Sequence, residues 1–114
     1  MSNILTPRHL KVGETALEPR EKLSPENGEI SALPVWKMGG ITHGIWQMAP
    51  GTLTNFPGPE TITLISGRAT VTVDQTGETV ELTPGDLFVI DEGETATWVV
   101  HETVRKVYAI HRDS

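Results

Sequence analysis

The feature that most constrains the fold is a series of short apolar stretches between Val35 and Ile110, separated by turns rich in glycine and proline. Ala69, Val71 and Val73 alternate with polar residues, which is the two-residue period of a strand with one buried face. Similar strand signals cover residues 40–48, 61–65, 78–82, 87–90, 95–100 and 104–110. Short strands at this spacing predict an all-β sandwich or small barrel, with at most one short helical turn.

The first 34 residues have a different character. They carry Pro7, Pro19 and Pro25 and the polar stretch EPREKLSPENGE. We therefore divide the chain into an irregular N-terminal extension, residues 1–34, and a barrel, residues 35–114. Short apolar pieces at 4–5 and 10–12 are too small to form a core, so they need either their own barrel or a second copy to bury against. An exchanged edge strand contributes twice under twofold symmetry, and we expect that exchange and a homodimer.

Composition excludes several classes of function. The net charge is -6 and no run of Lys or Arg exists, unlike proteins that hold nucleic acid or anionic membranes. The chain has no cysteine, which excludes disulfides, thiolate catalysis and cysteine-based zinc sites. No apolar run approaches the roughly 20 residues that span a bilayer, and no secretory signal is visible. We expect a cytoplasmic protein whose partner is a small molecule rather than nucleic acid or membrane.

Two stretches of the sequence, GTLTNFPGPETITLISG at residues 51–67 and GDLFVIDEG at residues 85–93, resemble the signature blocks of the cupin superfamily. In GTLTNFPGPETITLISG, Gly51, Glu60 and Gly67 resemble the glycine, glutamate and final glycine of the first block. In GDLFVIDEG, Gly85 and Gly93 resemble the glycines of the second. The resemblance implies a single small cupin-type β-barrel, also called a double-stranded β-helix or jelly roll.

The resemblance also implies that the usual metal site of this superfamily is missing. Its metal-binding members carry two histidines in the first block, which here fall at Thr54 and Phe56 or at Leu53 and Asn55. The histidine of the second block is replaced by Ala96. Of four ligands only Glu60 remains, and stable catalytic sites use about three protein ligands. We therefore predict no metal and no cofactor.

The C-terminal part narrows the resemblance to one branch of the cupins. It shows, in order, Gly93, Thr97, Trp98, Glu102, Arg105, Lys106 and Tyr108, and Trp46 precedes the Pro50–Gly51 turn. This set is similar to the metal-poor, single-domain branch that resembles the ureidoglycine aminohydrolase-like cupin domains. The match covers about residues 40–111. It implies the fold more firmly than it implies a reaction.

Five residues are candidates for a ligand-binding site: Glu60, Lys106, Tyr108, Trp46 and Trp98. Glu60 would share a strand face with apolar residues, where a carboxylate needs a cation or a raised pKa. Lys106 and Tyr108 share a face of the last strand and could pair with Glu60. The structural alternatives are a solvated Glu60 at the rim, a Lys106 in a purely structural ion pair, and tryptophans that only fill the core.

Two further questions stay open in the sequence. The register of the expected last hairpin decides whether Thr97 or Trp98 faces inward, and the sequence does not specify that register. The histidines lack the short spacing that places two imidazoles on one strand face. A metal site rebuilt from His43 with His101 or His111 is the remaining alternative.

Two classes of function are compatible with this pattern, beside a third interpretation as a pure oligomer scaffold with no ligand. The first is a small-molecule-binding cupin that holds a sugar-like or ureide-like metabolite in the barrel without metal. The second is a metal-independent isomerase, epimerase or hydrolase that uses Glu60, Lys106 and Tyr108 as acid and base. We favour the first class, because the missing ligands remove the chemistry that the resembled superfamily most often uses.

Overall fold

The structure is a computed structural model that describes residues 2–112. These residues form eight strands and no helix, and so contain no helical segment that could cross a membrane. The all-β prediction is confirmed. The strands are β1 (Glu18–Arg20), β2 (Ile30–Met38), β3 (Ile41–Met48), β4 (Gly51–Pro57), β5 (Glu60–Val73), β6 (Thr79–Leu82), β7 (Leu87–Ile90) and β8 (Thr95–His111).

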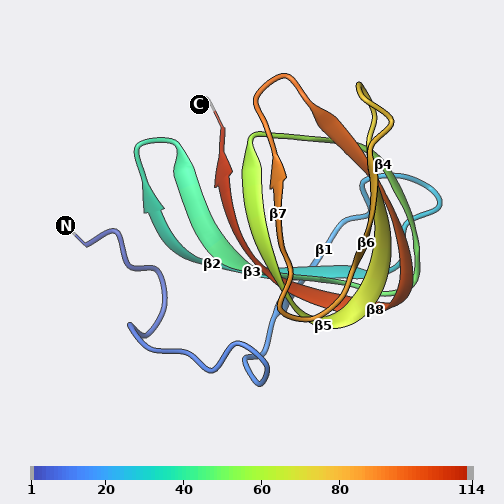
Figure 1. Cartoon of the computed structure of the whole chain (residues 1–114). Coiled ribbons are helices and arrows are strands. Elements are labelled where there is room, and N and C mark those ends of the chain that lie inside the picture. The colour runs from blue at the N-terminus through green and yellow to red at the C-terminus, as the bar shows by residue number, and fades with distance from the viewer. Residues whose placement is uncertain (1, 113–114) are drawn as a thin grey trace.

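The two longest strands, β5 and β8, organise the barrel (Figure 1). They pair with each other in antiparallel fashion over most of their length. Residues 104–111 of β8 also pair with β3, while residues 95–100 pair with β4. On β5, residues 60–63 pair with β7 and residues 69–72 with β6. One face of the barrel is thus β1-β2-β3-β8-β5-β7 and the other is β4-β8-β5-β6, which is a small jelly roll.

The hairpin expected between residues 95–100 and 104–110 does not form. These residues make the single 17-residue strand β8, which bends instead of turning. Its irregular stretch lies against the irregular stretch of β5 around Gly67. Gly67 has φ +89°, and a Cβ atom there would overlap the carbonyl of Thr103. Glycine therefore lets the two long strands bend together from one face of the barrel to the other.

Besides β1, which lies wholly within the expected extension, two strands extend beyond the expected strand signals. β4 occupies the segment between the Pro50–Gly51 turn and Glu60, where we expected no strand. β2 begins at Ile30, within the expected extension, and contains Pro34. A bulge between Pro34 and Trp36 accommodates the proline, which has no N–H for the β-ladder.

The interior is closely filled by alternating side chains. Ala69, Val71 and Val73 are buried, as their alternation predicts. Trp98 faces inward and is 0% exposed, which answers the question of register. Thr97 faces outward, where its hydroxyl donates to Asp74 Oδ1 at 2.8 Å.

The N-terminal segment lies on its own barrel in this structure. The N–H of Leu5 donates to the carbonyl of Val35, and the N–H of Lys37 donates to the carbonyl of Asn3. Farther along, the Arg105 guanidinium donates to the carbonyls of Val12 and Thr15. The segment makes these contacts within one chain and without a second copy. Its exchange between two copies therefore stays a prediction.

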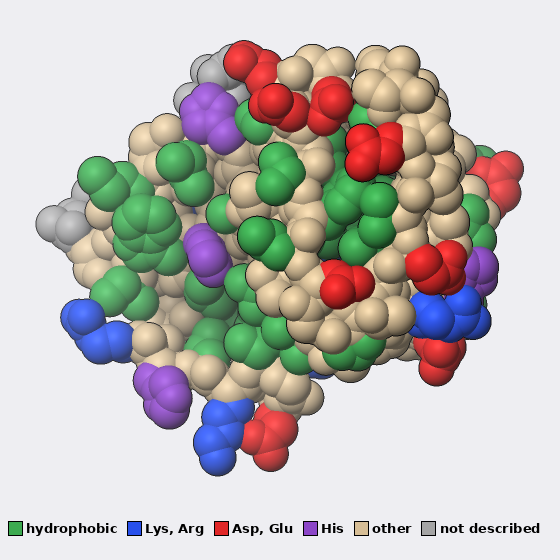
Figure 2. Space-filling view, in the orientation of Figure 1, with side chains coloured by type: hydrophobic (Ala, Val, Ile, Leu, Met, Phe, Trp, Pro, Cys, Tyr) green, Lys and Arg blue, Asp and Glu red, His purple; other side chains and the backbone are tan. Residues whose placement is uncertain are grey.

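The outer surface of the barrel carries a weakly charged, apolar area. Figure 2 shows hydrophobic side chains gathered near the middle of one face and acidic side chains near its upper edge. Among the exposed apolar residues are Ile41 on β3 and Leu87 and Val89 on β7. Exposed apolar patches of this kind are often contact surfaces.

Candidate functional site

A buried ion pair lies inside the barrel. Glu60 opens β5 and faces inward on the same side as Ile62 and Leu64, as the two-residue period predicts. Lys106 faces inward from β8, between Trp46 on β3 and Leu64 on β5. The Lys106 Nζ atom donates a hydrogen bond to Glu60 Oε2 at 3.0 Å, and both side chains are 1% exposed. The predicted pairing of a carboxylate with a cation is therefore present.

Aromatic rings surround the ammonium group of Lys106. Its Nζ atom lies 4.4 Å from the ring centroid of Trp46, 4.7 Å from that of Trp98 and 5.1 Å from that of Phe56. These distances are within the range of cation–π attraction, which strengthens when water is excluded. The pair is therefore stabilised by ring quadrupoles as well as by its own charges.

Two polar atoms of this site have no partner among the described residues. They are Glu60 Oε1 and Trp98 Nε1, and both are buried. The carboxylate oxygen can accept a hydrogen bond and the indole N–H can donate one. The site therefore offers one free acceptor and one free donor beyond the ion pair.

Burial shifts the pKa values of Lys106 and Tyr108. Removal from water lowers the pKa of Lys106 from its usual value of 10.5, and the nearby Glu60 carboxylate opposes that shift. The pKa of Tyr108 moves the other way. Burial and the Glu60 charge both raise it, so the phenol stays protonated at neutral pH.

Tyr108 lies beside the ion pair and does not join it by a hydrogen bond in the described part of the chain. It sits opposite Gly44 on β3 and Ile62 on β5, half-buried against the core. A Cβ atom at Gly44 would lie 2.7 Å from the Tyr108 hydroxyl, so the glycine leaves the space that the phenol fills. The structure thus brings Glu60 together with Lys106 and both predicted tryptophans, with Tyr108 as a neighbour.

Phe56 and Arg112 also belong to this site, although neither was among the residues predicted from the sequence. Phe56 is partly buried, and its ring centroid is 6.4 Å from that of Trp46. The Arg112 guanidinium lies 6.0 Å from the Phe56 centroid and donates to the carbonyls of Pro57 and Gly58. One signal could have found Phe56, because it occupies a position where the resembled pattern has an inward-facing histidine.

The donors in this barrel do not fit a divalent metal. Phe56 and Ala96, at two positions of the metal-binding pattern, lie directly opposite each other on β4 and β8. Glu60 is the buried carboxylate of the interior, and the Lys106 ammonium occupies the position next to it. Residues 2–112 contain no group of three His, Asp or Glu side chains arranged to hold an ion. His43 therefore does not come together with His101 or with His111 in such a group.

The family model of the EutQ-like cupin domain matches residues 35–108. The chain belongs to the EutQ-like cupin family. The resemblance to the cupin superfamily is thereby confirmed, while the ureidoglycine aminohydrolase-like branch stays a hypothesis. No curated protein matches this EutQ-like cupin in sequence.

Solved structures share the fold at low sequence identity. The Clostridium difficile EutQ protein has a TM-score of 0.72 at 16% identity, covering 90% of this chain and 85% of that one. The polyketide cyclase RemF from Streptomyces resistomycificus has a TM-score of 0.71 at 14% identity, covering 95% and 81%. A predicted oxalate decarboxylase from Thermotoga maritima has a TM-score of 0.72 at 13% identity, covering 90% and 97%. At such identities the likeness concerns the fold alone.

Proposed function

We propose that this EutQ-like cupin binds a small, uncharged polar metabolite inside its barrel at Glu60 and Lys106, without a metal ion. The observation that carries the proposal is the pair of unpartnered polar atoms, Glu60 Oε1 and Trp98 Nε1, beside a buried ion pair. A buried polar atom without a partner typically costs about 1–3 kcal/mol. A ligand that donates to Glu60 and accepts from Trp98 would remove that cost.

The chemistry around these atoms defines the class of ligand. The ion pair is neutral overall, so it favours an uncharged molecule over one whose charge would be buried without compensation. Sugar-like and ureide-like molecules carry hydrogen-bond donors and acceptors within a few bonds of each other. The flat faces of Trp46 and Trp98 suit such compact ligands, as aromatic walls do in many small-molecule sites.

Access to the site requires a movement at the mouth of the barrel. Trp46, Lys106 and Trp98 are at most 7% exposed, so the site is closed as it stands. Phe56 covers the ammonium on one side and is contacted from outside by Arg112. We propose that Phe56 moves outward when a ligand binds, because it is the partly buried member of the aromatic surround.

A second candidate function is acid–base catalysis at the same residues. The observation that favours it is the 3.0 Å separation between Lys106 Nζ and Glu60 Oε2, which permits direct proton transfer. The lowered pKa of Lys106 brings its neutral amine closer to physiological pH, where it could accept a proton. Tyr108 would remain a proton donor, since its pKa is raised.

The test uses the indole resonances of the three tryptophans in 15N-labelled protein. Erythritol serves as the sugar-like probe and hydantoin as the ureide-like probe. We expect a saturable shift of the Trp98 Nε1–H resonance with at least one probe. The exposed Trp36 provides an internal control that should not move.

The matched control is the double variant E60Q/K106M, which replaces the ion pair by neutral side chains of similar size. It should keep the fold and lose the probe-dependent shift. Native mass spectrometry of the purified wild type would reveal a co-purified metabolite. If that spectrum shows only the bare chain and neither probe moves Trp98, the proposal fails. Chemical conversion of a bound probe would favour the catalytic alternative.

A further inference from the structure

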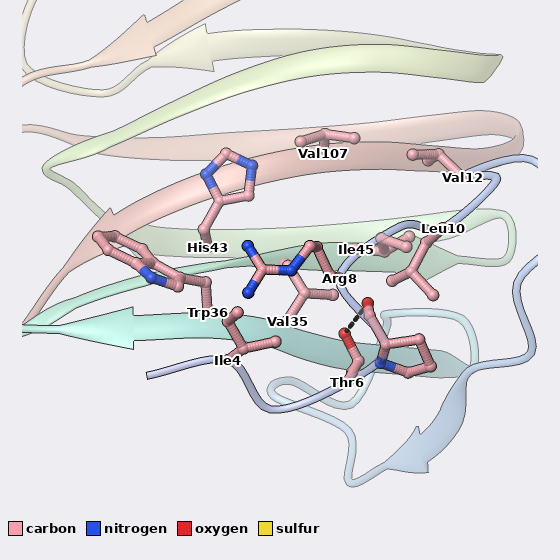
Figure 3. Close-up of a pocket in the computed structure, with 12 residues that line it drawn as sticks. Ile4, Thr6, Arg8, Leu10, Val12, Val35, Trp36, His43, Ile45 and Val107 are labelled. Atoms are coloured by element: carbon pink, nitrogen blue, oxygen red, sulfur yellow. Dashed lines mark hydrogen bonds between the residues drawn. The ribbon is translucent and has the colours of Figure 1, made fainter. Parts of the chain in front are cut away.

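A cavity lies outside the barrel, between its wall and the N-terminal segment (Figure 3). Its volume is about 410 Å³, within the range of sites for small organic molecules. Its floor includes Val35 on β2, Ile45 on β3 and Val107 on β8, and its roof comes from residues 4–12. Val107 follows Lys106 on the same strand and so points to the opposite side of the wall. This cavity is separate from the site inside the barrel.

The roof of the cavity is tied to the barrel at both ends. At one end, Leu5 N–H donates to the Val35 carbonyl at 3.0 Å. At the other, Arg105 donates to the Val12 carbonyl at 2.7 Å and to the Thr15 carbonyl at 2.9 Å. Between these ties the Thr6 hydroxyl donates to the adjacent Pro7 carbonyl rather than to the sheet (Figure 3). The N-terminal segment, residues 4–12, therefore covers the cavity and is hydrogen-bonded to the barrel at both of its ends.

The lining combines apolar walls with a single full positive charge. Ile45, on the floor, is 2% exposed although it lies outside the barrel. Arg8 comes from the roof, and Figure 3 shows its guanidinium directed toward the side lined by Trp36 and His43. Among the described residues that line the cavity there is no carboxylate, and Arg8 makes no ion pair with any residue of 2–112. The guanidinium is thus free to bind an anion.

We propose that this cavity binds an amphipathic monocarboxylate with a flat aromatic or branched aliphatic body. The guanidinium of Arg8 matches a carboxylate in geometry and in charge, because it can donate two parallel hydrogen bonds to it. The imidazole of His43 adds a further donor at the same end. The apolar body would lie on the floor between β3 and β8 and against the ring of Trp36, which is 38% exposed.

The experiment titrates the full chain with 2-naphthoate and, separately, with its neutral amide 2-naphthamide. Calorimetry measures the affinity, and 15N-labelled protein reports the location. We expect saturable binding of 2-naphthoate with amide shifts at Ile45 and Val107. The affinity for 2-naphthamide should be lower by about tenfold or more, since a hydrogen bond to a charged group is worth about 1.5–3 kcal/mol.

Substitutions in the N-terminal segment test whether Arg8 is the group that binds the carboxylate. Arg8→Gln should weaken 2-naphthoate about tenfold or more and leave 2-naphthamide unchanged, and Arg8→Lys should retain part of the affinity. Lys11→Gln removes a nearby exposed charge outside the lining and should have no effect. The double variant E60Q/K106M should also bind normally, which separates this site from the one inside the barrel.

Four results would overturn the proposal. Three of them are an absence of saturable binding at millimolar 2-naphthoate, equal affinity for the amide, and unchanged affinity in Arg8→Gln with a preserved far-UV spectrum. Shifts confined to the Trp98 indole would assign 2-naphthoate to the barrel interior and would likewise reject the outer site.

Discussion

Glu60 and Lys106 are 46 residues apart in the sequence, yet Lys106 Nζ and Glu60 Oε2 lie 3.0 Å apart in the closed interior of the barrel. Removing one member would leave the other charge buried without a partner. Breaking a buried pair in this way typically costs about 3–5 kcal/mol, whereas replacing both members by neutral groups is often tolerated. The first two predictions rest on this buried ion pair.

The first prediction concerns a double-mutant cycle. Lys106→Met should lower the free energy of unfolding by about 3 kcal/mol or more, and Glu60→Gln should also destabilise the protein. The double variant E60Q/K106M should recover most of the loss. Urea denaturation measures all four proteins. Costs that simply add would mean that the two groups do not interact in solution.

The second prediction concerns pH. Burial lowers the pKa of Lys106 in the folded state below the 10.5 that holds when it is unfolded. Between these two values the unfolded chain binds a proton that the folded chain does not, so the free energy of unfolding rises with pH. Urea denaturation from pH 7 to 10.5 should show wild type gaining stability relative to E60Q/K106M. A constant difference across that range would contradict the prediction.

At the alkaline end of that range, Tyr108 changes the free energy of unfolding in the direction opposite to Lys106. Its folded pKa is raised above 10.0, so above that pH the unfolded chain loses the proton first and stability falls as pH rises. Because both proteins keep Tyr108, the comparison between them largely cancels this effect. Tyr108→Phe in both backgrounds provides the check.

The third prediction concerns Gly44. A Cβ atom there would lie 2.7 Å from the Leu33 carbonyl oxygen and 2.7 Å from the Tyr108 hydroxyl. Gly44→Ala should therefore displace Tyr108 and destabilise the protein by about 1–3 kcal/mol, as overpacking does. Gly13→Ala is the matched control, because no atom lies within 4 Å of its Cβ position. Equal stability of the two variants in thermal denaturation would refute the expected clash.

The fourth prediction concerns metal content. With Glu60 as the remaining ligand of the cupin pattern, the purified protein should hold far less than one equivalent of Mn, Fe, Ni or Zn. Elemental analysis of wild type and Glu60→Gln tests this. The expected result is the same low content in both proteins. Nearly one equivalent in wild type, lost in the variant, would show that the barrel rebuilds a metal site.

The fifth prediction concerns assembly. We expect a homodimer, and the exposed apolar side chains Ile41, Leu87 and Val89 offer a surface for it that does not require an exchanged N-terminal strand. Light scattering should give twice the 12.4 kDa of one chain, and Val89→Asp should favour the monomer. The Thr76→Asp change, on an exposed turn, is the control. A wild-type mass near 12.4 kDa would exclude the dimer.

Local patterns predicted part of this site and missed the rest. The period of two residues grouped Glu60 with apolar neighbours on one face and Lys106 with Tyr108 on another, because neighbouring side chains of a strand point to opposite sides. The same period could not identify Phe56, since β4 was not recognised as a strand. It also could not join β8 into one strand, because the bend opposite Gly67 depends on a distant segment.

The sequence by itself determined the all-β class, because turn residues and alternation are local properties, and its resemblance to the cupin pattern indicated the small barrel and the incomplete set of metal ligands. Tertiary structure alone decided that Trp98 rather than Thr97 faces inward, that Phe56 and Arg112 cover the ion pair, and that the N-terminal segment roofs an outer cavity. The physical reason is that cross-strand register and the docking of an irregular segment arise from contacts between residues far apart in the chain, which no short window of sequence contains.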